Sequence, residues 1–213
     1  MKLTIFGATG GTGVLAVQRA LDGGHEVTAV VRDPAGLPSD LRACADVVRA
    51  DVMDPAAIEE AVQGRDAVLC ALGTRTGRAP TSVCADGARS IVTAMTATGT
   101  DRFVLVSAAG LHAGPGDDPF TRFVVKPLII GRLLKHAFAD MRVAEDLTRN
   151  SGLRWTIVRP PRLTNGAGNG RYRKAIDRNI LGGASIARAD LAIALLDVAD
   201  DPSAVEHVVS VSG

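Results

Sequence analysis

The sequence predicts an α/β fold in which helices cover both faces of a doubly wound parallel sheet. Short apolar runs alternate with segments of helical spacing along the whole chain. Such runs have the length and composition of strands that are buried on both faces, and their alternation with helices favours parallel strands joined by right-handed crossovers. No internal repeat or linker divides the 213 residues. We therefore expect one domain over residues 1–213.

Seven apolar runs are the expected strands. They are residues 3–6, 27–31, 47–50, 67–72, 103–107, 155–158 and 208–211. Helical spacing is clearest at Val14, Val17 and Leu21, which precede two glycines, and again over 191–198, which precede two aspartates and a proline. The first and last of these helices flank the predicted sheet.

Two irregular stretches, 111–123 and 159–173, follow the fifth and sixth expected strands. In doubly wound sheets, ligands bind beyond the carboxyl ends of the strands. We therefore expect a substrate cleft formed by residues 108–136 and 159–185. Ordinary surface loops are the alternative for both stretches.

Composition narrows the class of partner. The chain is 46% hydrophobic and 22% charged, and 24 basic residues nearly balance 23 acidic ones. Since aromatic residues are also scarce, nucleic-acid binding is not expected. No run approaches the roughly 18 apolar residues of a membrane-spanning helix. Three cysteines without CxxC spacing favour reduced thiols and a cytoplasmic location, and four histidines without ligand spacing favour no metal.

The first expected strand runs directly into a glycine-rich turn, and a helix follows at once. Gly7, Gly10 and Gly13 give the spacing GxxGxxG. A turn without side chains lets the backbone approach a pyrophosphate, whose charge is met by amides at the helix N-terminus. A glycine triplet alone also suits an ordinary turn. In the context of strand, turn and helix at the start of an alternating chain, it predicts dinucleotide binding.

Which dinucleotide binds depends on the end of the second strand, where Arg32 and Asp33 stand. A guanidinium pairs with the 2′-phosphate of NADP, whereas an acid binds both ribose hydroxyls of NAD. Because Arg32 comes first, we expect NADP(H). NAD(H) is the less favoured alternative, with Asp33 as the ribose ligand, and a solvated Arg32–Asp33 pair is the third reading.

Several segments resemble known oxidoreductases. Residues 5–13 (IFGATGGTG), 30–39, 71–77 and 87–95 resemble the biliverdin IXβ reductases, which are also NADPH-dependent flavin reductases. Residues 140–166 resemble the NmrA-like oxidoreductases of the same atypical short-chain dehydrogenase/reductase group. The motifs occur in the family's order over nearly the whole chain. The resemblance implies a Rossmann-like fold and an NAD(P)H-dependent oxidoreductase.

The resemblance also implies roles for single residues. Arg32 meets the 2′-phosphate, Asp51 and Val52 lie by the adenine, and Leu72, Gly73 and Thr74 pass beside the ribose. Ser107, Ala108, Pro160 and Pro161 flank the nicotinamide. The pyrophosphate is cradled by Gly7, Thr9, Gly10, Gly11, Thr12 and Gly13.

The chain departs from the family at two places. A second basic residue near the 2′-phosphate is replaced by Gly36, which weakens the case for NADP. The substrate-side histidines of the family are replaced by Met141, Glu145 and Arg162. The second departure argues against biliverdin as the substrate.

The residues also limit the chemistry. Alcohol-oxidising short-chain dehydrogenases use a Tyr-x-x-x-Lys pair, but the single tyrosine, Tyr172, is followed by Ile176 at the lysine position. Phe123 and Lys126 lie in the right region of the chain, but phenylalanine has no proton to give. Alcohol oxidation and sugar epimerisation are therefore not expected. Flat acceptors that need little help from a protein acid remain, namely flavins, quinones and conjugated tetrapyrroles.

Ser107 is the candidate catalytic residue, donating a hydrogen bond to the nicotinamide carboxamide or to the substrate. Its alternative role is to satisfy a strand-end amide. For Arg159 and Arg162, pairing with carboxylates such as Glu145 is favoured over substrate binding.

The sequence thus predicts an NADPH-dependent reductase of a flat or aromatic small molecule. A non-catalytic NADP(H)-binding redox sensor of the NmrA type is the alternative, as is a tailoring reductase of one aromatic metabolite.

Overall fold

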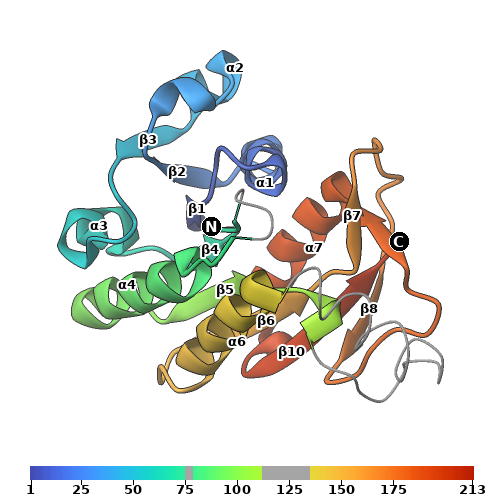
Figure 1. Cartoon of the computed structure of the whole chain (residues 1–213). Helices are drawn as coiled ribbons and strands as arrows, with labels where there is room; N and C mark the ends of the chain where they lie inside the picture. Colours follow the sequence, from blue (N-terminus) through green and yellow to red (C-terminus); the bar gives the residue numbers. More distant parts are fainter. Residues whose placement is uncertain (75–78, 112–134) are drawn as a thin grey trace.

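The computed structural model describes residues 1–74, 79–111 and 135–213, and an eight-stranded sheet forms its centre (Figure 1). The sheet has the order β3-β2-β1-β4-β5-β6-β10-β8, and every neighbouring pair is parallel except β8 and β10. Its strands are β1 (Lys2–Phe6), β2 (Glu26–Val31), β3 (Asp46–Arg49), β4 (Ala67–Cys70), β5 (Arg102–Val106), β6 (Arg154–Arg159), β8 (Arg173–Ile176) and β10 (His207–Ser212).

This order contains the sequence 3-2-1-4-5-6 of dinucleotide-binding doubly wound sheets. The chain reverses its winding between β1 and β4, which are neighbours in the sheet. A crevice forms at such a switch point, beyond the carboxyl ends of the strands. A second, two-stranded parallel sheet joins β7 (Arg162–Thr164) and β9 (Ser185–Ala187).

Helices cover both faces of the large sheet, as expected (Figure 1). Helices α1 (Gly11–Asp22) and α7 (Arg188–Asp200) share one apolar cluster with it, together with Leu41 of α2 (Ser39–Cys44). The opposite cluster includes residues of α3 (Pro55–Val62), α4 (Val83–Thr98) and α6 (Lys135–Arg149). Three short 3₁₀ turns are also present among the described residues: η1 (Pro34–Gly36), η2 (Ala109–Leu111) and η4 (Pro202–Ala204).

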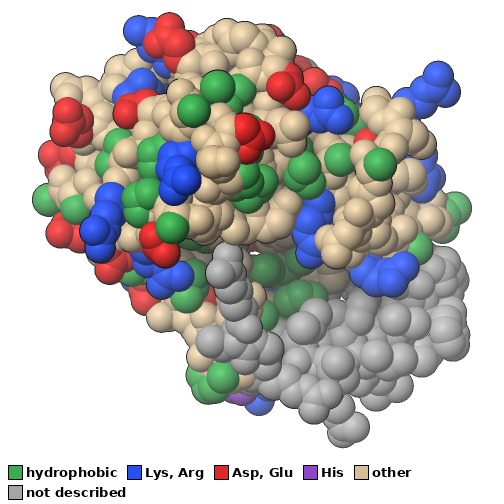
Figure 2. Space-filling view, turned by 90° about the horizontal axis from the view of Figure 1, so that it is seen from above, with side chains coloured by type: hydrophobic (Ala, Val, Ile, Leu, Met, Phe, Trp, Pro, Cys, Tyr) green, Lys and Arg blue, Asp and Glu red, His purple; other side chains and the backbone are tan. Residues whose placement is uncertain are grey.

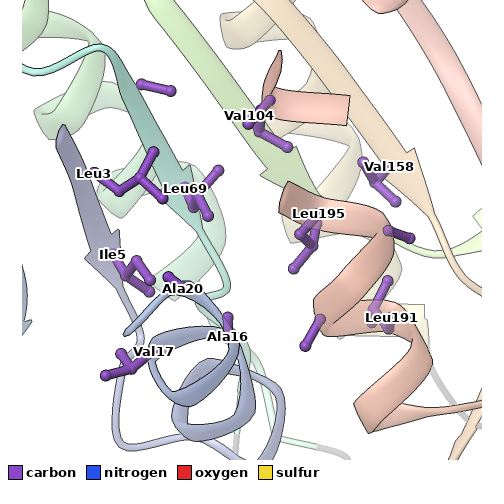
Figure 3. Packing of buried hydrophobic residues seen from close by; sticks show 14 of the residues in the cluster. Leu3, Ile5, Ala16, Val17, Ala20, Leu69, Val104, Val158, Leu191 and Leu195 are labelled. Carbon is purple, nitrogen blue, oxygen red and sulfur yellow. The ribbon is translucent and has the colours of Figure 1, made fainter. Parts of the chain in front are cut away.

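The core explains why the strands appear in the sequence as unbroken apolar runs. On the face that Figure 3 shows, Ile5 of β1 and Leu69 of β4 lie against α1, whose small Ala16 and Ala20 allow close approach, and Leu195 of α7 belongs to the same cluster. Phe6 points to the opposite cluster. Successive residues of a strand point to opposite faces, so strands covered on both sides are apolar throughout.

Contacts at helix ends fix the helices on the second face. Asp54 precedes α3, and its carboxylate accepts hydrogen bonds from the amides of Ala56 and Ala57 at 3.1 and 3.4 Å. Buried Asp140 of α6 does the same for α4, accepting from the amides of Cys84 and Ala85 at 2.9 and 2.8 Å. The capping carboxylate thus joins two helices that are distant in sequence.

The fold class and all seven expected strands are confirmed, with ends displaced by at most two residues. The expectation that 159–173 is irregular is wrong in part, because it contains β7 and the start of β8. These strands have three and four residues and a high proportion of charged side chains, so no apolar run marked them. Apart from Leu111, the stretch 111–123 lies outside the described residues.

On the surface that Figure 2 shows, basic and acidic side chains are interspersed. Within the described ranges, no helix combines the length and apolar character needed to cross a membrane.

Candidate dinucleotide and hydride-transfer site

The glycine-rich turn lies at the switch point, where β1 meets β4. Gly7 follows β1 with φ +77°, a left-handed conformation that favours glycine. A Cβ atom placed on Gly7 would lie 2.6 Å from the carbonyl oxygen of Ala71, the first residue after β4. Gly7 is therefore required both by its backbone conformation and by its contact with the neighbouring strand end.

Gly13 and Gly10 are required for different reasons. A Cβ atom on Gly13 would lie 2.1 Å from the Gly7 carbonyl oxygen, so this glycine lets α1 approach β1. Gly10 has φ −80° and ψ 160°, which any residue can adopt, and its nearest neighbour would be the Gly7 oxygen at 3.1 Å. The fold thus tolerates a side chain at Gly10 far better than at Gly13.

The N-terminus of α1 has features that favour the binding of an anion. Its N-cap residue is Gly10, which offers no side chain to the free amides, and its first turn contains no acidic residue. The unsatisfied amides and the helix dipole favour a negative charge at this end. The residues present therefore fit a dinucleotide pyrophosphate, and Thr9, Gly11 and Thr12 lie in the same turn.

At the end of β2, the side chains of Arg32 and Asp33 differ in their contacts. Arg32 follows the last strand residue, is exposed, and forms no hydrogen bond or ion pair with the part of the chain that the structure describes. The Asp33 carboxylate is the N-cap of η1, accepting from the Ala35 amide at 3.0 Å. Gly36 ends η1 beside Thr9: a Cβ atom there would lie 3.1 Å from the Thr9 methyl group. Of Arg32 and Asp33, Arg32 is therefore the residue whose side chain has no partner among the described residues.

The residues expected near the adenine and ribose follow β3 and β4. Asp51 is exposed, and one carboxylate oxygen accepts from the Met53 amide at 3.0 Å. The Val52 side chain is buried in the core, so only its backbone is offered to a ligand. Leu72 packs against Gly87 of α4, where a Cβ atom would lie 2.5 Å from its Cδ1 atom. Gly73 and Thr74 continue along the same edge, up to the first undescribed segment.

Ser107 follows β5 and belongs to a buried polar network. Its hydroxyl donates to Oε1 of Glu145 at 2.6 Å. Glu145, on α6, is fully buried, and it also accepts from Nε and Nη2 of Arg159 at 2.9 and 2.5 Å. Arg149, one turn further along α6, donates to Oε2 at 2.8 Å. The carboxylate thus ties the ends of β5 and β6 to α6. The favoured pairing of Arg159 with Glu145 is confirmed.

Burial opposes the negative charge on Glu145, but hydrogen bonds from Arg159 and Ser107, together with the charge of Arg159, outweigh it and lower its pKa to about 2. An ionised carboxylate only accepts hydrogen bonds. Ser107 must therefore be the donor. While the network is intact, the Ser107 oxygen can face a ligand only as an acceptor.

Backbone hydrogen bonds continue the pairing of β5 and β6 beyond the ends of these two strands. The Ser107 amide donates to the Val158 carbonyl at 2.8 Å, and the Ala109 amide donates to the Pro160 carbonyl at 2.9 Å. Ala108 therefore lies beside buried Pro160, with Pro161 next in the chain. Since β1, β4, β5 and β6 are neighbours, the expected cofactor residues that follow these strands share one edge of the sheet.

Some of the other candidate groups have raised pKa values, and others lie outside the described ranges. Tyr172 donates to Asp197 at 2.7 Å, and burial together with this hydrogen bond raises its pKa. Burial raises the pKa of Cys70 to about 12 and also raises that of Cys84. Within the described ranges, no group of three or more His, Cys, Asp or Glu side chains is placed to bind a metal. Phe123, Lys126 and most of the expected cleft segment 108–136 lie outside those ranges.

A family model described as NAD(P)H-binding matches residues 7–202. The chain belongs to the NAD(P)H-binding family. The match to the family model begins at Gly7, the first residue of the glycine-rich turn. The expectation that the chain binds NAD(P)H is thus confirmed, and solved structures named as a short-chain dehydrogenase/reductase, an oxidoreductase and a reductase share its fold.

Relatives within this family carry different names. A Bacillus subtilis protein named an uncharacterized sugar epimerase, YhfK, is 31% identical over 182 residues, which are 83% of this chain and 79% of YhfK. A short-chain dehydrogenase/reductase from Veillonella parvula, solved in complex with NADP, superimposes with a TM-score of 0.82 at 21% identity, covering 100% of this chain and 94% of that one. ChuY, named an anaerobilin reductase, from Escherichia coli O157:H7, gives 0.80 at 21% identity, covering 100% and 97%. These structures share the fold.

Proposed function

We propose that this NAD(P)H-binding protein is an NADPH-dependent reductase that delivers hydride to a flat, conjugated small molecule such as a flavin or a quinone. The observation that carries the proposal is the state of the chain's single tyrosine. Its hydroxyl is held by Asp197, its pKa is raised, and no lysine follows at the required spacing. The site therefore suits a conjugated acceptor, which needs no proton from a protein acid, better than an acceptor that requires such a proton.

NADPH supplies the hydride when bound, and the chain's own residues orient it. The turn between β1 and α1 receives the pyrophosphate. Ser107 and Pro160, at the adjoining ends of β5 and β6, flank the reacting ring. Holding donor and acceptor at close range supplies much of the rate in such a site. ChuY, whose name describes a reductase, supports this class of reaction.

The preference for NADPH over NADH is assigned to Arg32. Since Asp33 is occupied as the N-cap of η1, the guanidinium is the group free to meet a 2′-phosphate. A charged hydrogen bond of this kind is worth roughly 1.5–3 kcal/mol, and the exposure of Arg32 places it at the lower end, so NADPH should bind about tenfold tighter than NADH.

Titration of both cofactors by fluorescence tests this assignment. Arg32→Ala should bring the two affinities together. Arg19→Ala is a matched control, because it removes an exposed arginine from the opposite end of α1 and should leave the ratio unchanged. Equal affinities in the unmodified protein would refute the NADPH preference.

Turnover is tested by following NADPH absorbance with a panel of FMN, FAD, quinones and biliverdin. We expect oxidation with at least one flat acceptor, and none with simple alcohols, ketones or nucleotide sugars supplied with the matching cofactor. Absorbance that stays steady across the panel, in a protein that binds NADPH tightly, would reject the reductase and support the redox sensor.

A further inference from the structure

We propose that Arg188 is a second cationic ligand of the cofactor and binds the pyrophosphate from the α7 side. Arg188 is the first residue of α7, far in sequence from the glycine-rich turn. A Cβ atom on Gly11 would lie 3.1 Å from both Cδ and Nε of Arg188, and 3.8 Å from Cζ. The guanidinium therefore lies over the first residue of α1, where the pyrophosphate is expected.

The small sheet explains how Arg188 reaches this place. Strands β7 and β9 pair in parallel, with Thr164 opposite Ala187. The next residues, Asn165 and Arg188, therefore leave the sheet together, and Nη1 of Arg188 donates to Oδ1 of Asn165. Helix α7 then continues alongside α1, and both contribute to one apolar cluster (Figures 1 and 3). The side chain is thus anchored at one nitrogen and packed along its stem.

The electrostatics of Arg188 point to an anion. The side chain is half-buried, and among residues 1–74, 79–111 and 135–213 no carboxylate forms an ion pair with it. Its neighbour is the N-terminus of α1, which already carries a partial positive charge and has no acidic residue in its first turn. A cation in this place is unfavourable without an anion and favourable with one. The pyrophosphate, which the family's ligands share, satisfies both groups at once.

The role of Arg188 differs from that of Arg32 in a measurable way. The pyrophosphate is common to NADPH and NADH, whereas the 2′-phosphate belongs to NADPH alone. Arg188 should therefore contribute equally to the binding of both cofactors. This inference rests on the dinucleotide site and not on the acceptor, so it can fail or succeed separately from the proposed reductase activity.

The experiment is calorimetric titration of the full chain with NADPH, NADH and ADP-ribose, which has the pyrophosphate but no nicotinamide. Arg188→Ala should weaken all three by a similar factor, on the order of tenfold or more, as expected for a charged hydrogen bond. Arg188→Gln keeps most of the stem and a donor for Asn165 but loses the charge, and it should show nearly the same loss. Arg19→Ala should bind all three normally.

Melting without cofactor separates binding from structure. Because no carboxylate among the described residues pairs with Arg188 at this positive helix end, both variants should melt within a few degrees of the unmodified protein, while the upward shift caused by NADPH shrinks. The proposal is overturned if Arg188→Gln binds NADPH and NADH within twofold of the unmodified protein. It is equally overturned if the loss is confined to one of the two cofactors.

Discussion

Glu145→Gln removes the charge at the centre of the network that joins α6 to the ends of β5 and β6. Within the described residues, the carboxylate accepts four hydrogen bonds, from Ser107, Arg149 and, twice, Arg159. Glutamine has the same size, but its amide group must face donors where an oxygen now accepts. The Arg159 guanidinium is also left without its buried partner.

The stability lost in Glu145→Gln follows from two independent considerations. Breaking one side of a buried ion pair costs about 3–5 kcal/mol. Separately, lowering the pKa from 4.5 to about 2 corresponds to about 3 kcal/mol of native-state preference for the charged form, at 1.36 kcal/mol per pH unit. For a domain of this size, such a loss lowers the melting temperature by on the order of 10 °C.

Urea and thermal unfolding at pH 7 measure this effect, and Asp146→Asn is the matched control. Asp146 is the next residue of α6, its side chain is 73% exposed, and it meets Arg149 at 3.4 Å. An exposed pair of this kind contributes at most about 1 kcal/mol. If Glu145→Gln were no more destabilising than Asp146→Asn, the network would not hold the strand ends as described.

Three further predictions use the same structure. First, because the pKa of Glu145 is depressed in the folded state, its contribution to the free energy of unfolding is full above about pH 4.5 and is lost as the pH falls toward 2, so acid unfolding curves of the unmodified protein and Glu145→Gln should converge at low pH; parallel curves would contradict this. Second, Ser107→Ala should lower kcat/KM by roughly five- to thirty-fold without abolishing turnover, which corresponds to about 1–2 kcal/mol, the scale of one hydrogen bond; complete loss in a folded variant would assign Ser107 an indispensable role. Third, Gly13→Ala should destabilise the protein by about 1–3 kcal/mol, since its Cβ atom would lie 2.1 Å from the Gly7 oxygen, whereas Gly73→Ala, with no atom within 4 Å, should be neutral; equal melting temperatures would refute the packing argument.

Much of the fold follows from the sequence because a parallel sheet covered on both faces requires apolar strands. Phe6 and Ile5 are adjacent in β1 yet belong to opposite clusters, which is the pattern that made the run recognisable. The glycine-rich turn was recognisable for a related reason: Gly7 and Gly13 stand where the backbone admits no side chain.

The rest depends on contacts that no local pattern encodes. Strand β7 has three residues and no apolar run, so the position of Arg188 beside Gly11 had no sequence signal. Glu145 was recognisable as a partner for Arg159, but its full burial and its bond to Ser107 depend on where α6 packs. In the same way, the hydrogen bond that Asp33 accepts from the Ala35 amide is a detail of one turn that no pattern encodes.

The account's central claim is that the turn between β1 and α1 binds the dinucleotide through its backbone, and calorimetric titration of NADPH into Gly10→Val tests it most directly. Gly10 has a conformation open to any residue, and only the Gly7 oxygen lies near a Cβ atom there. The variant should therefore fold and melt close to the unmodified protein while losing detectable NADPH binding. A folded Gly10→Val protein that binds NADPH as tightly as the unmodified chain would contradict the claim.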